Sequence, residues 1–206
     1  MRGNAFLRFD YQGHGQSSGD FNEGTIGEWL SDAIDALDQL TDGPQVLVGS
    51  SMGGWMMLLV ARARPQRIAG LLGLASAPDF TEDLIQAELS DAQKAELNTN
   101  GVVSIPNDHD DREPYRINKK LLDEGAKQLL LREPLKLDCP IRLIHGINDA
   151  DVPWSTSMRI METVTSADVE VTLVKAGEHR LSEELDLDRL RRTLGALLDQ
   201  LENSAS

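Results

Sequence analysis

The chain has 206 residues, of which 40% are hydrophobic and 26% are charged, a composition typical of a folded globular domain and not of a disordered segment. Its formal net charge of −14 would repel a nucleic-acid backbone or an anionic membrane surface. We therefore expect no nucleic-acid partner. We also expect no membrane span, because the chain lacks a run of about 18 apolar residues.

Cysteine usage and the first residues bear on the compartment. Cys139 is the single cysteine, which excludes an intrachain disulfide and fits a reducing environment. The start of the chain has neither the apolar stretch nor the cleavage signature of a secretion signal. The sequence therefore predicts a cytoplasmic protein, with Cys139 as a structural thiol.

Short apolar runs alternate with longer helical patterns, and this alternation predicts an α/β fold with a mostly parallel sheet flanked by helices. Each run is nearly continuous in apolar residues, as expected of a strand that is buried on both faces. We interpret residues 1–206 as a single domain. The predicted strands cover residues 5–9, 45–48, 68–74, 141–144 and 169–174.

The first helix is predicted over residues 26–40, where Thr25 and Glu28 have the spacing of a capping box. Three more helices are expected: one after Gly53, one over residues 155–165 and one over residues 183–201. The side chains expected to face inward are Leu30, Ala33, Ile34, Leu37 and Leu40 in the first helix and Leu187, Leu190, Leu194, Leu197 and Leu198 in the last.

The most informative motif, Gly49-Ser50-Ser51-Met52-Gly53-Gly54, lies between a predicted strand and a predicted helix. Gly-x-Ser-x-Gly in this setting is typical of a nucleophile elbow, a tight turn that exposes the central serine. We expect Ser51 to be the nucleophile and the small residues Gly49 and Gly53 to permit the turn. The backbone N–H of Met52, at the helix start, would stabilise an oxyanion.

Residues 79–138 interrupt the alternation and are interpreted as an insertion. Two amphipathic pieces, over residues 84–97 and 119–131, flank an irregular acidic loop at 107–114. An insertion at this point lies over the carboxyl ends of the strands, where open α/β sheets bind ligands. We expect a small helical lid. The alternative is a solvated helical excursion with no role in substrate binding.

Asp149 is the predicted carboxylate partner of a catalytic histidine, because it follows the strand at 141–144. Asp151 is the competing candidate, and either aspartate could instead cap the helix that follows Trp154. We favour Asp149.

His179 is the predicted general base, since it lies in the loop after the last strand and imidazole titrates near neutral pH. Of the other histidines, His14 lies in a glycine turn, His109 in the acidic loop, and His145 is expected to pack or hydrogen-bond behind Asp149. These isolated histidines form no metal-ligand cluster, and the chain has no glycine-rich nucleotide fingerprint. No metal or cofactor is therefore expected.

Four segments together resemble α/β-hydrolase-fold serine hydrolases: Arg8 to Ser17, Gly49 to Trp55, Cys139 to Trp154, and His179-Arg180. The chain is most similar to the branch of palmitoyl-protein thioesterases that are also described as acyl-glucuronide esterases. The resemblance implies a Ser51, Asp149 and His179 triad and an acyl-enzyme intermediate. It also implies hydrolysis, without a cofactor, of a small-molecule or protein-linked acyl ester or thioester.

The start of the chain departs from this family pattern. Members of the fold begin with further strands, and the loop after the third strand supplies a second oxyanion donor. This chain begins at what resembles the fourth strand, so we expect an N-terminally truncated sheet with an open edge. The alternative function is thus a hydrolase-like binding module or an inactive truncated product, and a third reading is amide hydrolysis by the same triad.

Overall fold

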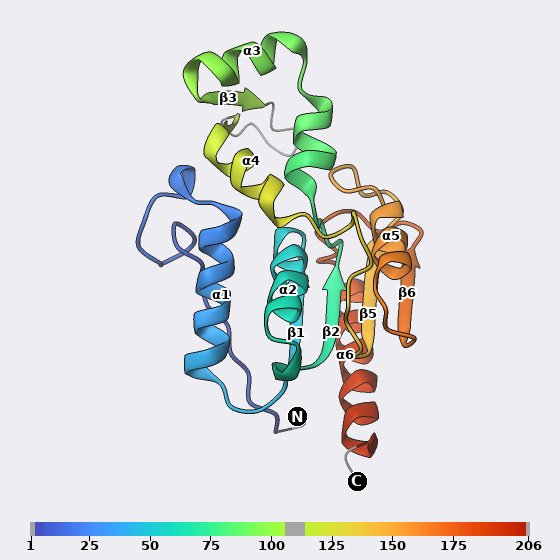
Figure 1. The fold of residues 1–206 in the computed structure, drawn as a ribbon. Coiled ribbons are helices and arrows are strands. Elements are labelled where there is room, and N and C mark those ends of the chain that lie inside the picture. Colours follow the sequence, from blue (N-terminus) through green and yellow to red (C-terminus); the bar gives the residue numbers. More distant parts are fainter. Residues whose placement is uncertain (1–2, 106–113, 205–206) are drawn as a thin grey trace.

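The centre of the fold is a parallel sheet (Figure 1) in the computed structural model, which describes residues 3–105 and 114–204. All strands of the sheet run in one direction, so their carboxyl ends meet at one edge. In spatial order, the sheet contains β1 (Gln45–Ser50), β2 (Ile68–Leu74), β5 (Ile141–Gly146) and β6 (Val169–Val174). Four of the five predicted strands are thus confirmed.

Helices cover both faces of this sheet. They are α1 (Ile26–Leu40), α2 (Met52–Ala63), α5 (Ser155–Thr163) and α6 (Glu184–Ser204). Alternate side chains of β2 point to opposite faces, so Leu71 joins the core with α1, α2 and α5, while Leu72 lies in the cluster that α6 covers. Both faces are apolar, which explains why β2 reads as a continuous hydrophobic run.

The predicted helix boundaries are confirmed to within a few residues, but two side chains that were predicted to face inward do not. Thr25 caps α1 as predicted, its Oγ1 accepting the Glu28 N–H at 3.2 Å. The buried stripe of α1 ends at Leu37, so the prediction for Leu40, which is 64% exposed in the last turn, was wrong. Leu187 in the first turn of α6 is also mostly outside the core.

The segment predicted as a strand over residues 5–9 is not a strand. A strand requires a partner for its backbone ladder, and none of the described strands pairs with this segment. Phe6 is therefore 86% exposed despite its apolar character. The chain turns inward beyond it, where the His14 ring lies against both Phe21 and Trp29 with ring centroids 5.1 Å apart.

The part of the insertion from residue 81 to residue 128 lies beyond the end of the sheet to which β2 points, and the following residues return along the sheet to the start of β5 (Figure 1). The single piece predicted over 84–97 was wrong: it is divided before α3, because Ser90 forms a capping box with Gln93 that starts a new helix. An antiparallel strand pair was not anticipated, and residues 107–113 of the acidic loop lie outside the described residues. The described elements are η3 (Thr81–Gln86), α3 (Asp91–Asn100), β3 (Val102–Ile105), β4 (Tyr115–Asn118), α4 (Lys119–Gly125) and η4 (Ala126–Gln128).

Asp79, at the start of the insertion, forms hydrogen bonds with the backbone of the segment near its end. Its buried carboxylate accepts the backbone N–H groups of Leu130 at 2.7 Å and of Leu131 at 2.9 Å. Burial raises the pKa of Asp79, although these hydrogen bonds and Arg132 partly offset that effect. The backbone at Asp79 is left-handed, with φ of 60°, a conformation that Asp and Asn adopt more readily than most residues.

Asp79→Asn should lower the free energy of unfolding by about 1 to 3 kcal/mol, because the amide can accept only one of the two buried N–H groups. Asparagine tolerates the same backbone conformation, so the loss reports on hydrogen bonding. Urea unfolding measures it. The control is Asp123→Asn, which removes an exposed ion pair with Lys119 and should cost less than about 1 kcal/mol. Equal losses in the two variants would contradict the assigned role of Asp79.

Candidate active site

Ser51 occupies a strained turn between β1 and α2. Its φ of 53° and ψ of −122° lie outside the regions that serine normally adopts. Backbone hydrogen bonds hold the turn: Ser51 N–H donates to the Leu74 carbonyl at 2.9 Å, and its carbonyl accepts the Ala77 N–H at 3.0 Å. The strain is therefore maintained by the neighbouring strand β2 and the loop after it.

The glycines of the motif contribute unequally to this turn. A Cβ at Gly49 would lie 2.3 Å from the Gly53 carbonyl oxygen, so a side chain is excluded there, as predicted. A Cβ at Gly53 would meet nothing within 4 Å, so the prediction that Gly53 must lack bulk was wrong. The second crowded position is Gly54, where a Cβ would lie 2.3 Å from Ser76 Oγ.

The structure brings Ser51, His179 and Asp149 into one hydrogen-bonded line. His179 Nε2 lies 2.9 Å from Ser51 Oγ, and His179 Nδ1 lies 2.8 Å from Asp149 Oδ2. Since a carboxylate only accepts, Nδ1 carries the proton of the neutral ring and Nε2 is left to accept from the serine hydroxyl. The three residues come from loops after β1, β5 and β6, all at the carboxyl edge of the sheet.

Asp149, and not Asp151, makes the close contact with His179. The nearest Asp151 oxygen lies 3.9 Å from His179 Nδ1, beyond hydrogen-bond distance. The Asp149 side chain is fully covered, and its Oδ1 accepts the N–H groups of Asp151 at 2.9 Å and Val152 at 2.8 Å. The loop that contains both aspartates thus folds around the first of them.

These surroundings set the protonation states of the pair. Burial would raise the pKa of Asp149, but hydrogen bonds from His145, His179 and Val152 outweigh it and hold that pKa well below its usual range. Burial would lower the pKa of His179, but the hydrogen bond and charge of Asp149 outweigh it, so the pKa of His179 is raised. Asp149 is therefore ionised at neutral pH, and it favours a positive charge on His179.

His145 lies behind Asp149, as predicted. Its Nε2 is 3.2 Å from Asp149 Oδ2 and 3.0 Å from the Val152 carbonyl, and its Nδ1 is 2.7 Å from Ser157 Oγ. Both neighbours of Nε2 are acceptors, so Nε2 carries a proton and, in the neutral ring, Ser157 donates to Nδ1. Ser157 was missed by sequence reasoning, because a serine within a helix gives no signal of its partner.

The remaining candidates lie apart from this line or have indirect roles. Met52 is the first residue of α2, where backbone N–H groups have no acceptor within the helix, so its role as an oxyanion donor stays a prediction. His14 lies in the aromatic cluster at α1, and His109 lies outside the described residues. Burial raises the pKa of the Cys139 thiol, which disfavours a reactive thiolate.

Among the described residues, Asp149, Asp151 and His179 are close enough to be considered as metal ligands, with one atom from each within 4.8 Å of the others. The observed hydrogen bonds fit a cation poorly. Both Asp149 oxygens already accept N–H groups, and His179 Nδ1 carries a proton toward Oδ2. A metal would have to replace these contacts, so the geometry favours the hydrogen-bonded line of Ser51, His179 and Asp149 over a metal centre.

Comparison with known proteins identifies the family. A model of the alpha/beta hydrolase family matches residues 2–192. The chain belongs to this family, and with it the predicted fold class is confirmed. The sequence is 41% identical over 199 residues to human palmitoyl-protein thioesterase ABHD10, mitochondrial, and 40% identical to the bovine protein. These alignments cover 97% of this chain and 65% of each relative, so the chain spans less than two thirds of their length.

Solved structures give the same grouping. The mouse alpha/beta hydrolase domain-containing protein 10 superposes with a TM-score of 0.87 at 38% identity, covering 94% of this chain and 77% of that one. A putative hydrolase from Agrobacterium vitis S4 gives a TM-score of 0.88 at 37% identity, covering 92% and 75%. These similarities support the predicted branch. None of the helices in the described part of the chain has the length and apolar character needed to cross a membrane.

Asp149→Asn should lower the pKa of His179 from its raised position toward the ordinary value of about 6.5, because the neighbouring negative charge is lost. An NMR titration of the His179 ring protons measures the shift. The Asp151 carboxylate lies 3.9 Å from His179 Nδ1 and is partly exposed. Asp151→Asn should therefore lower the pKa of His179 by less than Asp149→Asn does. A larger decrease in Asp151→Asn would reverse the assignment of the two aspartates.

Proposed function

We propose that this chain is a serine hydrolase that cleaves carboxyl-ester or thioester bonds through an acyl-enzyme intermediate. The observation that carries the proposal is the line of contacts from Ser51 Oγ through both nitrogens of His179 to Asp149, with distances of 2.9 and 2.8 Å. A serine aligned in this way on a histidine and a buried carboxylate is the arrangement needed for nucleophilic attack on a carbonyl.

In the proposed reaction, Ser51 Oγ bonds to the acyl carbon while its proton passes to His179 Nε2. The ionised Asp149 stabilises the resulting imidazolium. The Met52 N–H donates to the oxyanion until the carbonyl re-forms. His179 then protonates the leaving alcohol or thiol. Water, deprotonated by His179, hydrolyses the acyl-serine in a second cycle, so no cofactor is consumed.

The names of the relatives support a proposed substrate class. ABHD10 is named as a palmitoyl-protein thioesterase, which supports a long-chain acyl thioester on a protein as one substrate type. The resemblance noted from the sequence adds acyl-glucuronide esters as a second type. The cytoplasmic location predicted from the sequence remains a prediction, and those relatives are named as mitochondrial proteins.

A second candidate, stated from the sequence, is a hydrolase-like binding module without turnover. Its premise is that the Met52 N–H acts without a second oxyanion donor, and loss of a single donor reduces kcat by about 10² to 10³ in a well-studied hydrolase. Both candidates retain an aligned Ser51. They differ in whether an acyl group is released at enzymatic rates.

Labelling with a fluorophosphonate probe tests the nucleophile. We expect Ser51 to be labelled in the wild-type chain and labelling to be lost in Ser51→Ala, because Ser51 contacts the partly exposed His179, whereas Ser157, which contacts His145, is buried away from a probe. Ser50→Ala is the matched control, and it should retain the label. Absence of a Ser51-dependent label on the folded chain would refute the proposal. Turnover of p-nitrophenyl acyl esters at enzymatic rates would exclude the binding module.

The pH dependence of kcat/KM tests the base. Only neutral His179 can accept the Ser51 proton, so kcat/KM should fall as pH decreases through the raised pKa of His179, with a midpoint above about 6.5. Asp149 should add no second acid limb near this range, because its pKa is held low. Asp151→Asn should move the midpoint slightly downward. A profile that stays flat from pH 5 to 8 would show that His179 is not the base.

A further inference from the structure

We propose that Arg159, together with Arg132 and Lys94, forms a subsite that binds an anionic group, a carboxylate or a phosphate, on the leaving-group side of the substrate. The proposal rests on the proposed function in one respect, namely that a substrate is attacked at Ser51. The subsite consists of a hollow with a charged lining that adjoins a second hollow near the triad.

Two adjoining hollows lie near the residues that contact the triad. The smaller one, of about 140 Å³, has Ala77 and Val152 in its lining. Ala77 N–H donates to the Ser51 carbonyl, and Val152 N–H donates to Asp149 Oδ1, so these residues are direct neighbours of the triad. The larger hollow, of about 730 Å³, shares Asp83 and Arg159 with the smaller one. The two hollows therefore share part of their lining, and the smaller one lies beside residues that contact Ser51 and Asp149.

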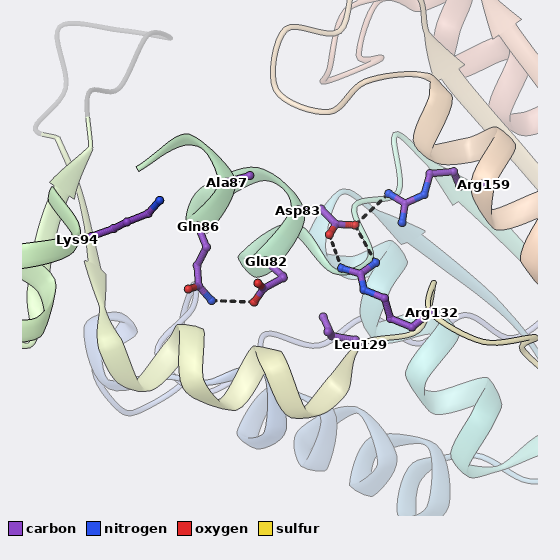
Figure 2. A pocket seen from close by; sticks show the side chains of 8 residues that line it. All are labelled: Glu82, Asp83, Gln86, Ala87, Lys94, Leu129, Arg132 and Arg159. Carbon is purple, nitrogen blue, oxygen red and sulfur yellow. Dashed lines mark hydrogen bonds and ion pairs between the residues drawn. The ribbon is translucent and has the colours of Figure 1, made fainter. Parts of the chain in front are cut away.

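The lining of the larger hollow suits a polar group and not an acyl chain. Figure 2 shows Arg132, Arg159 and Lys94 around it, with Glu82, Asp83 and Gln86 on η3 or beside it. An acyl chain is apolar and gains nothing from such a lining. The other half of the substrate, the leaving group, is therefore the part that this hollow can recognise.

Asp83 orders the two guanidinium groups. Arg159 Nη1 lies 2.9 Å from Asp83 Oδ2, and Arg132 Nη1 lies 3.1 Å from the same oxygen, with a second bond from Arg132 to Oδ1 (Figure 2). Burial would raise the pKa of Asp83, but these hydrogen bonds and charges lower it, so the carboxylate stays ionised. Two arginines on one carboxylate are thus held side by side before a ligand arrives, which reduces the entropy that binding must remove.

Arg159 keeps donors for a ligand. A guanidinium has five N–H donors, and the contact recorded for Arg159 in the described part of the chain uses Nη1 toward Asp83. Its side chain is 42% exposed, on the wall common to both hollows. Arg132, by contrast, also lies 3.3 Å from buried Asp79. Arg159 is therefore the main anion-binding residue, and Arg132 and Lys94 are the other cations of a lining that also contains the carboxylates of Glu82 and Asp83.

The competing explanation is a purely structural ion pair that ties η3 to α5 through Asp83 and Arg159. That role predicts a loss of stability in Arg159→Gln with no dependence on the charge of the substrate. The subsite predicts a charge-dependent loss. The two explanations are separated by a matched pair of substrates and by a direct binding measurement.

Binding is measured first, in the Ser51→Ala chain, by following the arginine Nε–Hε signals in NMR titrations. Inorganic phosphate and acetate are added in separate titrations at constant ionic strength held with chloride. We expect saturable shifts of the Arg159 signal with one or both anions, and the arm that responds identifies the preferred anion. The signal of exposed Arg191, paired with Asp188 on α6, should not saturate. An Arg159 signal that behaves like that of Arg191 in both arms overturns the subsite, whether or not the chain is a hydrolase.

Kinetics then test the link to the substrate. Two thioesters with the same octanoyl group are compared, one made with 3-mercaptopropionate and one with its uncharged amide. The loss of kcat/KM in Arg159→Gln should be about tenfold larger for the anionic thioester, mainly through KM, because a charge-assisted hydrogen bond is lost. In Arg191→Gln, the change in kcat/KM should be the same for both thioesters. Equal losses for both thioesters in Arg159→Gln overturn the subsite, whereas failure of the proposed function would appear as no Ser51-dependent turnover of either.

Discussion

The buried carboxylate of Asp149 is the constraint on which the rest of the site depends. A carboxylate removed from water is stable only when its oxygens accept enough hydrogen bonds. Here two backbone N–H groups hold Oδ1, while His179 and His145 hold Oδ2. The same contacts that stabilise the charge also fix the orientation of His179. One set of hydrogen bonds thus offsets the burial of Asp149 and aligns His179 with Ser51.

The elbow meets a second constraint, which is close backbone packing. Ser51 reaches His179 only because β1 ends in a turn that brings Gly49 against Gly53 and lets Gly54 lie against Ser76. Each close approach couples the motif to a neighbouring segment, and Ser76 belongs to the loop after β2 and not to the motif. The strained backbone at Ser51 is thus held by contacts at the carboxyl ends of both β1 and β2, including its hydrogen bonds with Leu74 and Ala77.

Features that depend on a pattern within one segment could be predicted from the sequence, whereas features that depend on a contact with a distant segment could not. The strand at 68–74 was predictable because both of its faces are buried, and His179 was predictable because a parallel sheet brings every post-strand loop to one edge. The segment at 5–9 has a strand-like composition, but strand formation depends on a partner that composition does not reveal. Ser157 was unpredictable for the same reason, since its importance comes from a contact with His145 across the fold. Likewise, within the described residues β3 pairs with β4 alone, and neither strand is long enough to give a clear pattern.

The two histidines that share Asp149 show how burial separates roles within one residue type. His145 has no exposed side-chain surface and is held at both nitrogens, by Ser157 on one side and by Val152 and Asp149 on the other. It therefore has no free position through which to exchange a proton with a substrate. His179 is 18% exposed, and its second nitrogen faces the Ser51 hydroxyl. The carboxylate thus has one fixed donor that sets its position and one accessible partner that it can polarise, and only the latter can serve as a base in the proposed reaction.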